Sequence, residues 1–254
     1  MKILSSSQIY QADQATIKNT PISSTDLMER AASKCVDWIL GLNVNRSKRI
    51  HVFCGRGNNG GDGLVISRLL IQKGFQVITY DVNFSRRRSP DCEINLKRLI
   101  ETGHKPIEID ESTAFPKLFD GEFIIDAIFG IGLTRAPEGV SKKIIEKINQ
   151  SGAEVIAIDI PSGLFAESSV TQPSSVIRAS HTLTFQHPKL AFFLPENHCY
   201  IKNWVVLDIG LDQTFIDAVE CQYTASDKAA LKGMVKRRER FSHKGTYGHS
   251  LLIG

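Results

Sequence analysis

The stretch that most constrains the fold of this chain is a glycine-rich run directly after a short apolar segment. Residues 55–63 read Gly-Arg-Gly-Asn-Asn-Gly-Gly-Asp-Gly and follow Arg-Ile-His-Val-Phe-Cys at residues 49–54. Glycine accepts backbone conformations that other residues avoid and lets the chain approach a ligand closely. The next residues favour a helix that ends at Gly74. A strand, a glycine-rich turn and a helix in this order aim backbone N–H groups at one point, which suits a phosphate.

The same run fits the dinucleotide-binding pattern G-x-G-x-x-G at Gly55, Gly57 and Gly60. Asp81 lies 21 residues after Gly60, about where that pattern places an acid that binds ribose. An NAD-dependent dehydrogenase is therefore one function that the pattern allows. A P-loop kinase is not, because no Gly-Lys-Ser/Thr follows the run.

Three polar side chains inside the run go beyond what phosphate binding needs. Asn58, Asn59 and Asp62 bring oxygen atoms that suit a cation or a polar substrate. A simpler interpretation is that these residues only cap the following helix. We favour a ligand, because a cap requires only one such residue.

Short apolar segments alternate with helical patterns along most of the chain. The first forty residues favour helices, with serines as caps. Strands are expected at 49–54, 76–82, 122–126, 154–159, 181–185 and 203–208, and helices at 62–73, 89–102, 112–118 and 139–151. Alternation of this kind predicts an α/β fold, a Rossmann-like three-layer αβα sandwich with a mostly parallel central sheet and N-terminal helices.

Two further strands of the predicted sheet end in an acid followed by a glycine-bearing loop. Asp126 closes one strand and leads into Gly130, Gly132 and Arg135, whose side chain could pair with a phosphate. Asp159 closes the next strand and leads into Ile-Pro-Ser-Gly at residues 160–163. Ligands of parallel sheets bind at the carboxyl ends of strands, so we expect these loops and the glycine-rich run to form one crevice.

Composition places the chain among soluble globular proteins. It has 254 residues, 42% of them hydrophobic and 23% charged, with a net charge of +4. The basic runs lack the aromatic residues that nucleic-acid binding would add, so no nucleic-acid partner is expected. The five cysteines show no metal or disulfide spacing, and the sequence has neither a signal-peptide pattern nor a membrane-spanning run. We therefore expect a cytoplasmic protein with no membrane association.

Three ordered motifs carry a resemblance to a known family. The glycine-rich run, Asp126-Ala-Ile-Phe-Gly-Ile-Gly-Leu and Asp159-Ile-Pro-Ser-Gly-Leu together resemble the YjeF N-terminal domain, the NAD(P)H-hydrate (NAD(P)HX) epimerase. The resemblance covers residues 1–225. Residues 226–254 look like a linker and the truncated start of a ribokinase-like, ADP/ATP-dependent NAD(P)HX dehydratase, which many members carry in cis.

The resemblance implies a repair activity that interconverts the R and S forms of hydrated NADH and NADPH at C6 of the nicotinamide ring. It implies a potassium ion held by Asn59, Asp126 and Ser162, with Asp126 expected as the acid/base. The residues implied for substrate binding are Asn58, Asn59, Gly60, Gly61, Asp62, Gly130, Ile131, Gly132, Leu133, Thr134, Arg135, Ala136 and Asp159.

Two questions stay open at this point. A non-catalytic scaffold with the same fold is the alternative function, although such relatives tend to lose the acid that this chain keeps as Asp126. The oligomeric state is also open, and the N-terminal helices would offer a surface for a homodimer. Neither the preference for NADHX or NADPHX nor the identity of the proton-transferring acid follows from the sequence.

Overall fold

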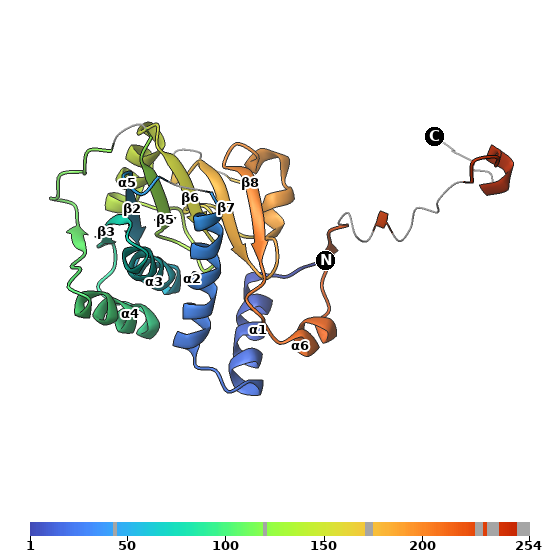
Figure 1. The fold of residues 1–254 in the computed structure, drawn as a ribbon, viewed down its shortest axis with the longest axis horizontal. Helices are drawn as coiled ribbons and strands as arrows, with labels where there is room; N and C mark the ends of the chain where they lie inside the picture. Colours follow the sequence, from blue (N-terminus) through green and yellow to red (C-terminus); the bar gives the residue numbers. More distant parts are fainter. Residues whose placement is uncertain (43–44, 119–120, 171–174, 227–230, 233–238, 248–254) are drawn as a thin grey trace.

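The structure is a computed structural model that describes residues 1–42, 45–118, 121–170, 175–226, 231–232 and 239–247. Strands and helices alternate through most of these ranges (Figure 1). The strands are β1 (Lys2–Ile3), β2 (Arg49–Cys54), β3 (Gln76–Val82), β4 (Ile107–Ile109), β5 (Phe123–Ala127), β6 (Glu154–Ile158), β7 (Ala179–Phe185), β8 (Ile201–Leu207) and β9 (Tyr223–Thr224). The α-helices are α1 (Ser6–Asn19), α2 (Ser24–Gly41), α3 (Asn58–Gln72), α4 (Pro90–Glu101), α5 (Gly139–Gln150) and α6 (Gln213–Ala218). The 3₁₀ helices are η2 (Leu190–Phe193), η3 (Pro195–Asn197) and η4 (Lys244–Tyr247).

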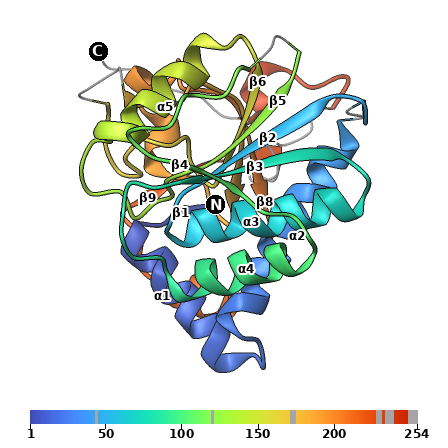
Figure 2. The same ribbon diagram turned by 90° about the vertical axis from the view of Figure 1, so that its left-hand side faces the viewer.

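The central sheet has seven strands in the order β4-β3-β2-β5-β6-β7-β8. Every neighbouring pair in it is parallel. Helices α2, α3 and α4 cover one face and α5 covers the other, as Figure 2 shows. The predicted three-layer αβα architecture is confirmed. The crossover from β3 and β4 on one side of β2 to β5 on the other makes the carboxyl ends of β2 and β5 a topological switch point, where such sheets bind ligands.

The core explains why these segments form strands. Val52 and Cys54 pack under α2 and α3, while Phe53 between them packs on the α5 side. On β5, Ile125 packs under α2 and α3, and Ile124 packs on the α5 side. Successive side chains of a strand point to opposite faces, so a strand covered on both sides reads as a continuous apolar run.

The N-terminal segment is bound to the last elements of the domain in the sequence. Ser5 and Gln8 form a capping box that starts α1, as the serine-rich sequence predicts. β1 pairs antiparallel with β9, with Lys2 opposite Thr224. The Lys2 ammonium also donates to the backbone carbonyls of Ile216, Asp217 and Val219. Helix α1 is therefore held in place by residues two hundred positions later in the chain.

One predicted helix is wrong, and some short strands escaped prediction. Residues 112–118 are not helical, because the Asp110 carboxylate accepts hydrogen bonds from Ser112 and Thr113 and forms a turn instead. The three-residue strand β4 lies just before this turn. β1 and β9 have two residues each, too few for any periodic pattern.

The proposed division at residue 225 stays a prediction. β9 ends at Thr224, one residue before that division. Residues 251–254, expected to begin a second domain, lie outside the described residues. In the ranges that the structure describes, no helix combines the length and apolarity needed to cross a membrane.

Candidate functional site

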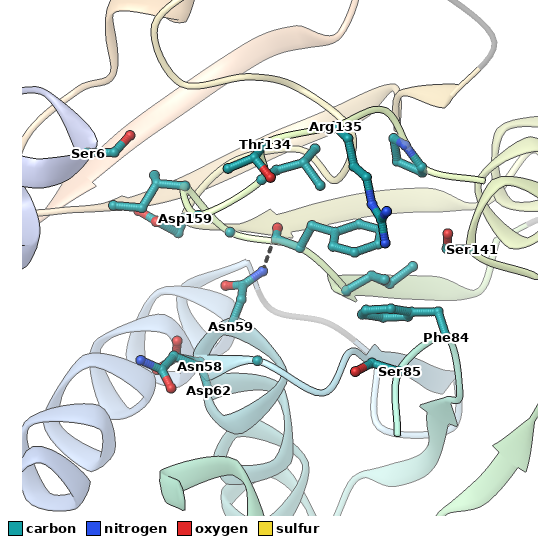
Figure 3. Close-up of a pocket in the computed structure, with 18 of the residues that line it drawn as sticks. Ser6, Asn58, Asn59, Asp62, Phe84, Ser85, Thr134, Arg135, Ser141 and Asp159 are labelled. Atoms are coloured by element: carbon teal, nitrogen blue, oxygen red, sulfur yellow. Dashed lines mark hydrogen bonds between the residues drawn. The ribbon is translucent and has the colours of Figure 1, made fainter. Parts of the chain in front are cut away.

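A cavity of about 1020 Å³ opens at the carboxyl ends of β2, β5 and β6. Its volume suits a dinucleotide-sized ligand. It is lined by Asn58, Asn59 and Asp62 of the glycine-rich run, by the whole loop Gly130–Ala136, and by Asp159. The three loops predicted to converge do so, as Figure 3 shows.

The cavity has chemically different ends. Asp159 and Asp62 lie toward one end, together with Ser6 of α1 (Figure 3). Arg135 and Phe84 lie toward the other end, where the Phe84 ring packs 4.6 Å from the ring of Phe129. One end carries the carboxyl groups of Asp62 and Asp159, and the other offers an exposed guanidinium and an aromatic surface, while Glu111 and Glu138 also line the cavity.

The glycine-rich run forms the first turn of α3 through very close backbone contacts. A Cβ on Gly55 would lie 1.9 Å from the carbonyl oxygen of Ile128, and one on Gly60 would lie 1.9 Å from the carbonyl oxygen of Gly55. Gly57 is the N-cap residue of α3, and no side chain caps this helix. The interpretation of the polar residues of the run as mere caps is therefore wrong. Gly60 and Gly61 serve the packing of the turn and are not in the cavity lining.

Asn59, Asp126 and Ser162 meet around the backbone of one residue, Phe129. Asn59 Nδ2 donates to the Phe129 carbonyl at 2.9 Å (dashed in Figure 3), and the Phe129 N–H donates to Ser162 Oγ at 2.8 Å. Ser162 Oγ donates to Asp126 Oδ1 at 2.5 Å. Asn59 Oδ1 is buried and has no hydrogen-bond partner among the described residues. A buried oxygen left unpaired costs free energy, so its position calls for a ligand.

Asp126 lies beneath the cavity rather than in it. Its side chain is fully buried, and it is absent from the cavity lining. Both carboxylate oxygens accept hydrogen bonds, from the Ser162 N–H and hydroxyl and from the Ile128 N–H. Burial raises the pKa of Asp126 to about 6, although these hydrogen bonds oppose the shift. Its placement suits holding the loop and a cation, and gives it no direct access to a substrate in the cavity.

Asp159 reaches the cavity from a strained position beyond β6. Its φ of 64° lies in the left-handed region, which non-glycine residues seldom occupy. Asp159 Oδ1 accepts from Lys189 Nζ at 2.9 Å and from the Phe185 N–H at 3.3 Å. Lys189 is almost fully buried, and its ammonium also donates to the carbonyls of Phe185 and His187. This ion pair fixes a negative charge at the acidic end of the cavity.

Sequence reasoning missed Lys189 and Asp13. Lys189 follows β7, so the rule that ligands bind at strand ends, applied to that strand, would have found it. Asp13 lies on α1 and lines the cavity, but no motif marks it. It joins Asp62 and Asp159 at the acidic end because α1 packs beside α2 and α6 and turns one face to the cavity.

Asp81 does not serve as a free ribose-binding acid in this structure. Its carboxylate is bound by the guanidinium groups of Arg56 and Arg88. It is buried and is not part of the cavity lining. The dinucleotide pattern at Gly55, Gly57 and Gly60 is therefore present without the acid that a dehydrogenase of this type would use.

Comparisons with known proteins agree on one family. Residues 24–191 match the profile of the family described as "YjeF-related protein N-terminus". The chain is 32% identical over 249 residues to the "Bifunctional NAD(P)H-hydrate repair enzyme Nnr" of Coxiella burnetii, covering 97% of this chain and 49% of that protein. It is 33% identical over 205 residues to the "NAD(P)H-hydrate epimerase" of Limosilactobacillus fermentum, covering 81% of this chain and 95% of that protein.

A solved structure supports the fold. The crystal structure of the yeast protein ynu0 superimposes with a TM-score of 0.69 at 20% identity, covering 89% of this chain and 97% of the yeast chain. The chain spans about half the length of the bifunctional relatives it matches. It belongs to the YjeF-related N-terminal family.

Proposed function

We propose that this chain interconverts the R and S epimers of hydrated NADH and NADPH at C6 of the nicotinamide ring. The observation that carries the proposal is the cavity at the switch point, which joins the three family motifs in a space of dinucleotide size. Relatives that match most of this chain and are themselves matched over nearly their whole length are named NAD(P)H-hydrate epimerases. Epimerisation exchanges the face of C6 that carries the hydroxyl group and needs no redox partner.

The two ends of the cavity set the orientation of the substrate. The diphosphate would lie near the N-terminus of α3 and Arg135, because backbone N–H groups and a guanidinium stabilise phosphate charge. The adenine would then lie near Phe84, and the hydrated nicotinamide would lie at the acidic end with Asp159.

A potassium ion would sit against Asn59, Asp126 and Ser162. The donor set fits, because a buried amide oxygen without a partner, a carboxylate and a hydroxyl are all hard oxygen ligands. A cation there would supply positive charge close to the substrate loop. Within this chain, Asn59 orients the Phe129 peptide and Asp126 holds Ser162, so the site and the loop Gly130–Ala136 are built together.

The wider setting follows from the relatives. Some of the relatives are named epimerases and others bifunctional repair enzymes. We therefore propose that this domain works with a dehydratase, in cis in the full-length protein. All five cysteines are free thiols, which is compatible with the cytoplasm proposed as its compartment.

The test uses the R epimer of hydrated NADPH and an independent dehydratase specific for the S epimer. Return of NADPH is followed by its absorbance, with the chain present or absent and with potassium or sodium as the only monovalent cation. We expect the chain to accelerate NADPH return above the spontaneous rate, and more so in potassium. A folded chain without acceleration would favour the non-catalytic scaffold.

An independent measurement addresses the cation. Potassium bound to the folded state alone raises the melting temperature with concentration. Asn59→Ala should abolish this rise, because it removes the unpaired oxygen. Exposed Asn203→Ala serves as the matched control and should keep it. If potassium and sodium raise the melting temperature equally, and do so in both variants, the assignment of a potassium site is wrong.

A further inference from the structure

We propose that Asp13 of α1 is the group that gives a proton to the departing hydroxyl of the substrate and takes one back from the returning water. This inference rests on the proposed epimerase function and names a residue outside the family motifs. Asp13 also lies outside residues 24–191, which match the family profile.

Helix α1 forms one wall of the cavity through a single face. The residues of α1 in the lining are Ser6, Ile9, Tyr10 and Asp13, which follow the i, i+3, i+4, i+7 spacing of one helix face. Asp13 is the only carboxyl group on this face, and it is half-buried. Its carboxylate forms no hydrogen bond or ion pair within the part of the chain that the structure describes. It is therefore available to a ligand.

The neighbouring carboxyl groups are less suited to the same task. Asp126 is outside the cavity lining. Asp159 Oδ1 is already bound by the buried ammonium of Lys189 and by the Phe185 N–H. Asp62 is more than nine-tenths buried, and burial followed by the charges of Asp159 and Asp13 raises its pKa well above the ordinary value. A carboxyl that stays protonated cannot take a proton back.

The surroundings of Asp13 suit both halves of the exchange. The charged and titratable groups that face it are Asp62 on α3, Asp159 after β6 and Lys189 after β7, with Tyr10 on its own helix. Burial and then the Asp159 charge raise the pKa of Asp13 to about 6, while Lys189 opposes the shift. An acid/base with a pKa near the working pH populates both forms and is the most effective in proton transfer.

The step balances without a further reactant. The lone pair of the ring nitrogen forms a C6=N double bond while the C6–O bond breaks, and the oxygen takes the proton of Asp13 and departs as water. The cationic ring turns over about its bond to the ribose, and a water molecule on the Asp13 side then adds to the face of C6 opposite the one that lost the hydroxyl group. The electrons of the double bond return to nitrogen, and the proton lost by the water returns to the Asp13 carboxylate.

The acid form of Asp13 starts the cycle, which fixes the direction of the pH dependence. After subtraction of the spontaneous rate, kcat/KM of the wild-type chain should decrease as the pH rises through the pKa of Asp13. In Asp13→Asn, kcat should decrease about 10²- to 10⁴-fold, the usual share of general acid–base catalysis, with KM changed only a few-fold. The residual activity should show no dependence on pH in this region.

The experiment compares Asp13→Asn, Asp13→Glu and the control Asp37→Asn, which removes an exposed carboxyl from α2. These three variants and the wild type are assayed from about pH 5 to about pH 8, on both sides of the pKa of about 6 of Asp13, with melting temperatures as the test of folding. Asp13→Glu should recover activity relative to Asp13→Asn and restore the pH-dependent decrease, and Asp37→Asn should match the wild type. If Asp13→Asn keeps the activity of the wild type, or keeps its pH profile, the role of Asp13 is overturned and the epimerase function is not. An inactive but folded wild-type chain would overturn the epimerase function and this inference together.

Discussion

Gly63 fixes how closely α3 can lie on the sheet, and replacing it by alanine tests that packing. A Cβ at this position would lie 2.6 Å from Cβ of Ala127 on β5 and 2.8 Å from Sγ of Cys54 on β2. Both neighbours are buried, and the Ala127 methyl group has no alternative rotamer. The first turns of α3, which carry Asn59 and Asp62 into the cavity, would therefore have to move away from the strands.

The expected loss of stability follows from two opposing contributions. Overpacking a dense core costs about 1–3 kcal/mol, and two contacts below 3.0 Å place this substitution in the upper half of that range. Alanine in a helix gains about 1 kcal/mol over glycine. The difference is a destabilisation of about 1–2 kcal/mol, which for a chain of this size lowers the melting temperature by about 2–8 °C.

Urea unfolding of Gly63→Ala against Gly41→Ala measures the packing contribution. Gly41 is the last residue of α2 and has open space where a Cβ would be, so its replacement should leave stability unchanged or raise it by up to about 1 kcal/mol. Adding Ala127→Gly to Gly63→Ala should recover much of the loss, because the two sites are in contact. A Gly63→Ala chain at least as stable as the wild type would refute the reasoning.

Three further predictions concern buried polar groups. Lys189→Met leaves the Asp159 carboxylate without its ammonium and should lower the free energy of unfolding by about 3 kcal/mol, measured in urea; full stability would show that the pair contributes nothing. Asp126→Asn places an amide N–H₂ against the donors of Ser162 and should cost about 1–3 kcal/mol by the same measurement, whereas an unchanged midpoint would argue against the hydrogen-bond network. Burial lowers the pKa of His51 below its ordinary 6.5, so the unfolded chain binds the proton more tightly and stability is lost as the pH decreases below about 6.5. His51→Gln should lack this part of the loss, and a constant stability difference between the two proteins from neutral to acidic pH would contradict it.

The fold could be predicted from the sequence because its strands are buried on both faces. Residues 50–54 and 155–158 are apolar except for His51, and each run is followed by a break that glycine or an acid marks. The helix predicted at 112–118 was wrong because Asp110 competes for local backbone hydrogen bonds, which an apolar pattern does not register.

The candidate site could be predicted where the chemistry coincides with strand ends. Asn59, Asp159 and the loop Gly130–Ala136 follow from that rule and line the cavity. The depth of Asp126 could not be predicted, since a carboxylate at a strand end can point into a crevice or into the loop beneath it. Asp13 could not be predicted either, because its place depends on how a helix with no motif packs against α2 and α6.

The pairing of β1 with β9 has a consequence for the time at which the cavity becomes complete. Lys2 pairs with Thr224. The strand that precedes α1, the helix that carries Asp13, therefore cannot pair until residues at the opposite end of the domain have been made. A ribosome adds about 5–20 residues per second, and the interval between these two residues is therefore roughly ten to forty seconds. Until residue 224 has been added, β1 lacks its partner strand, so the contacts that fasten the start of α1 can be completed only late in synthesis. The two ends of the domain are therefore joined after the strands of the central sheet have all been made.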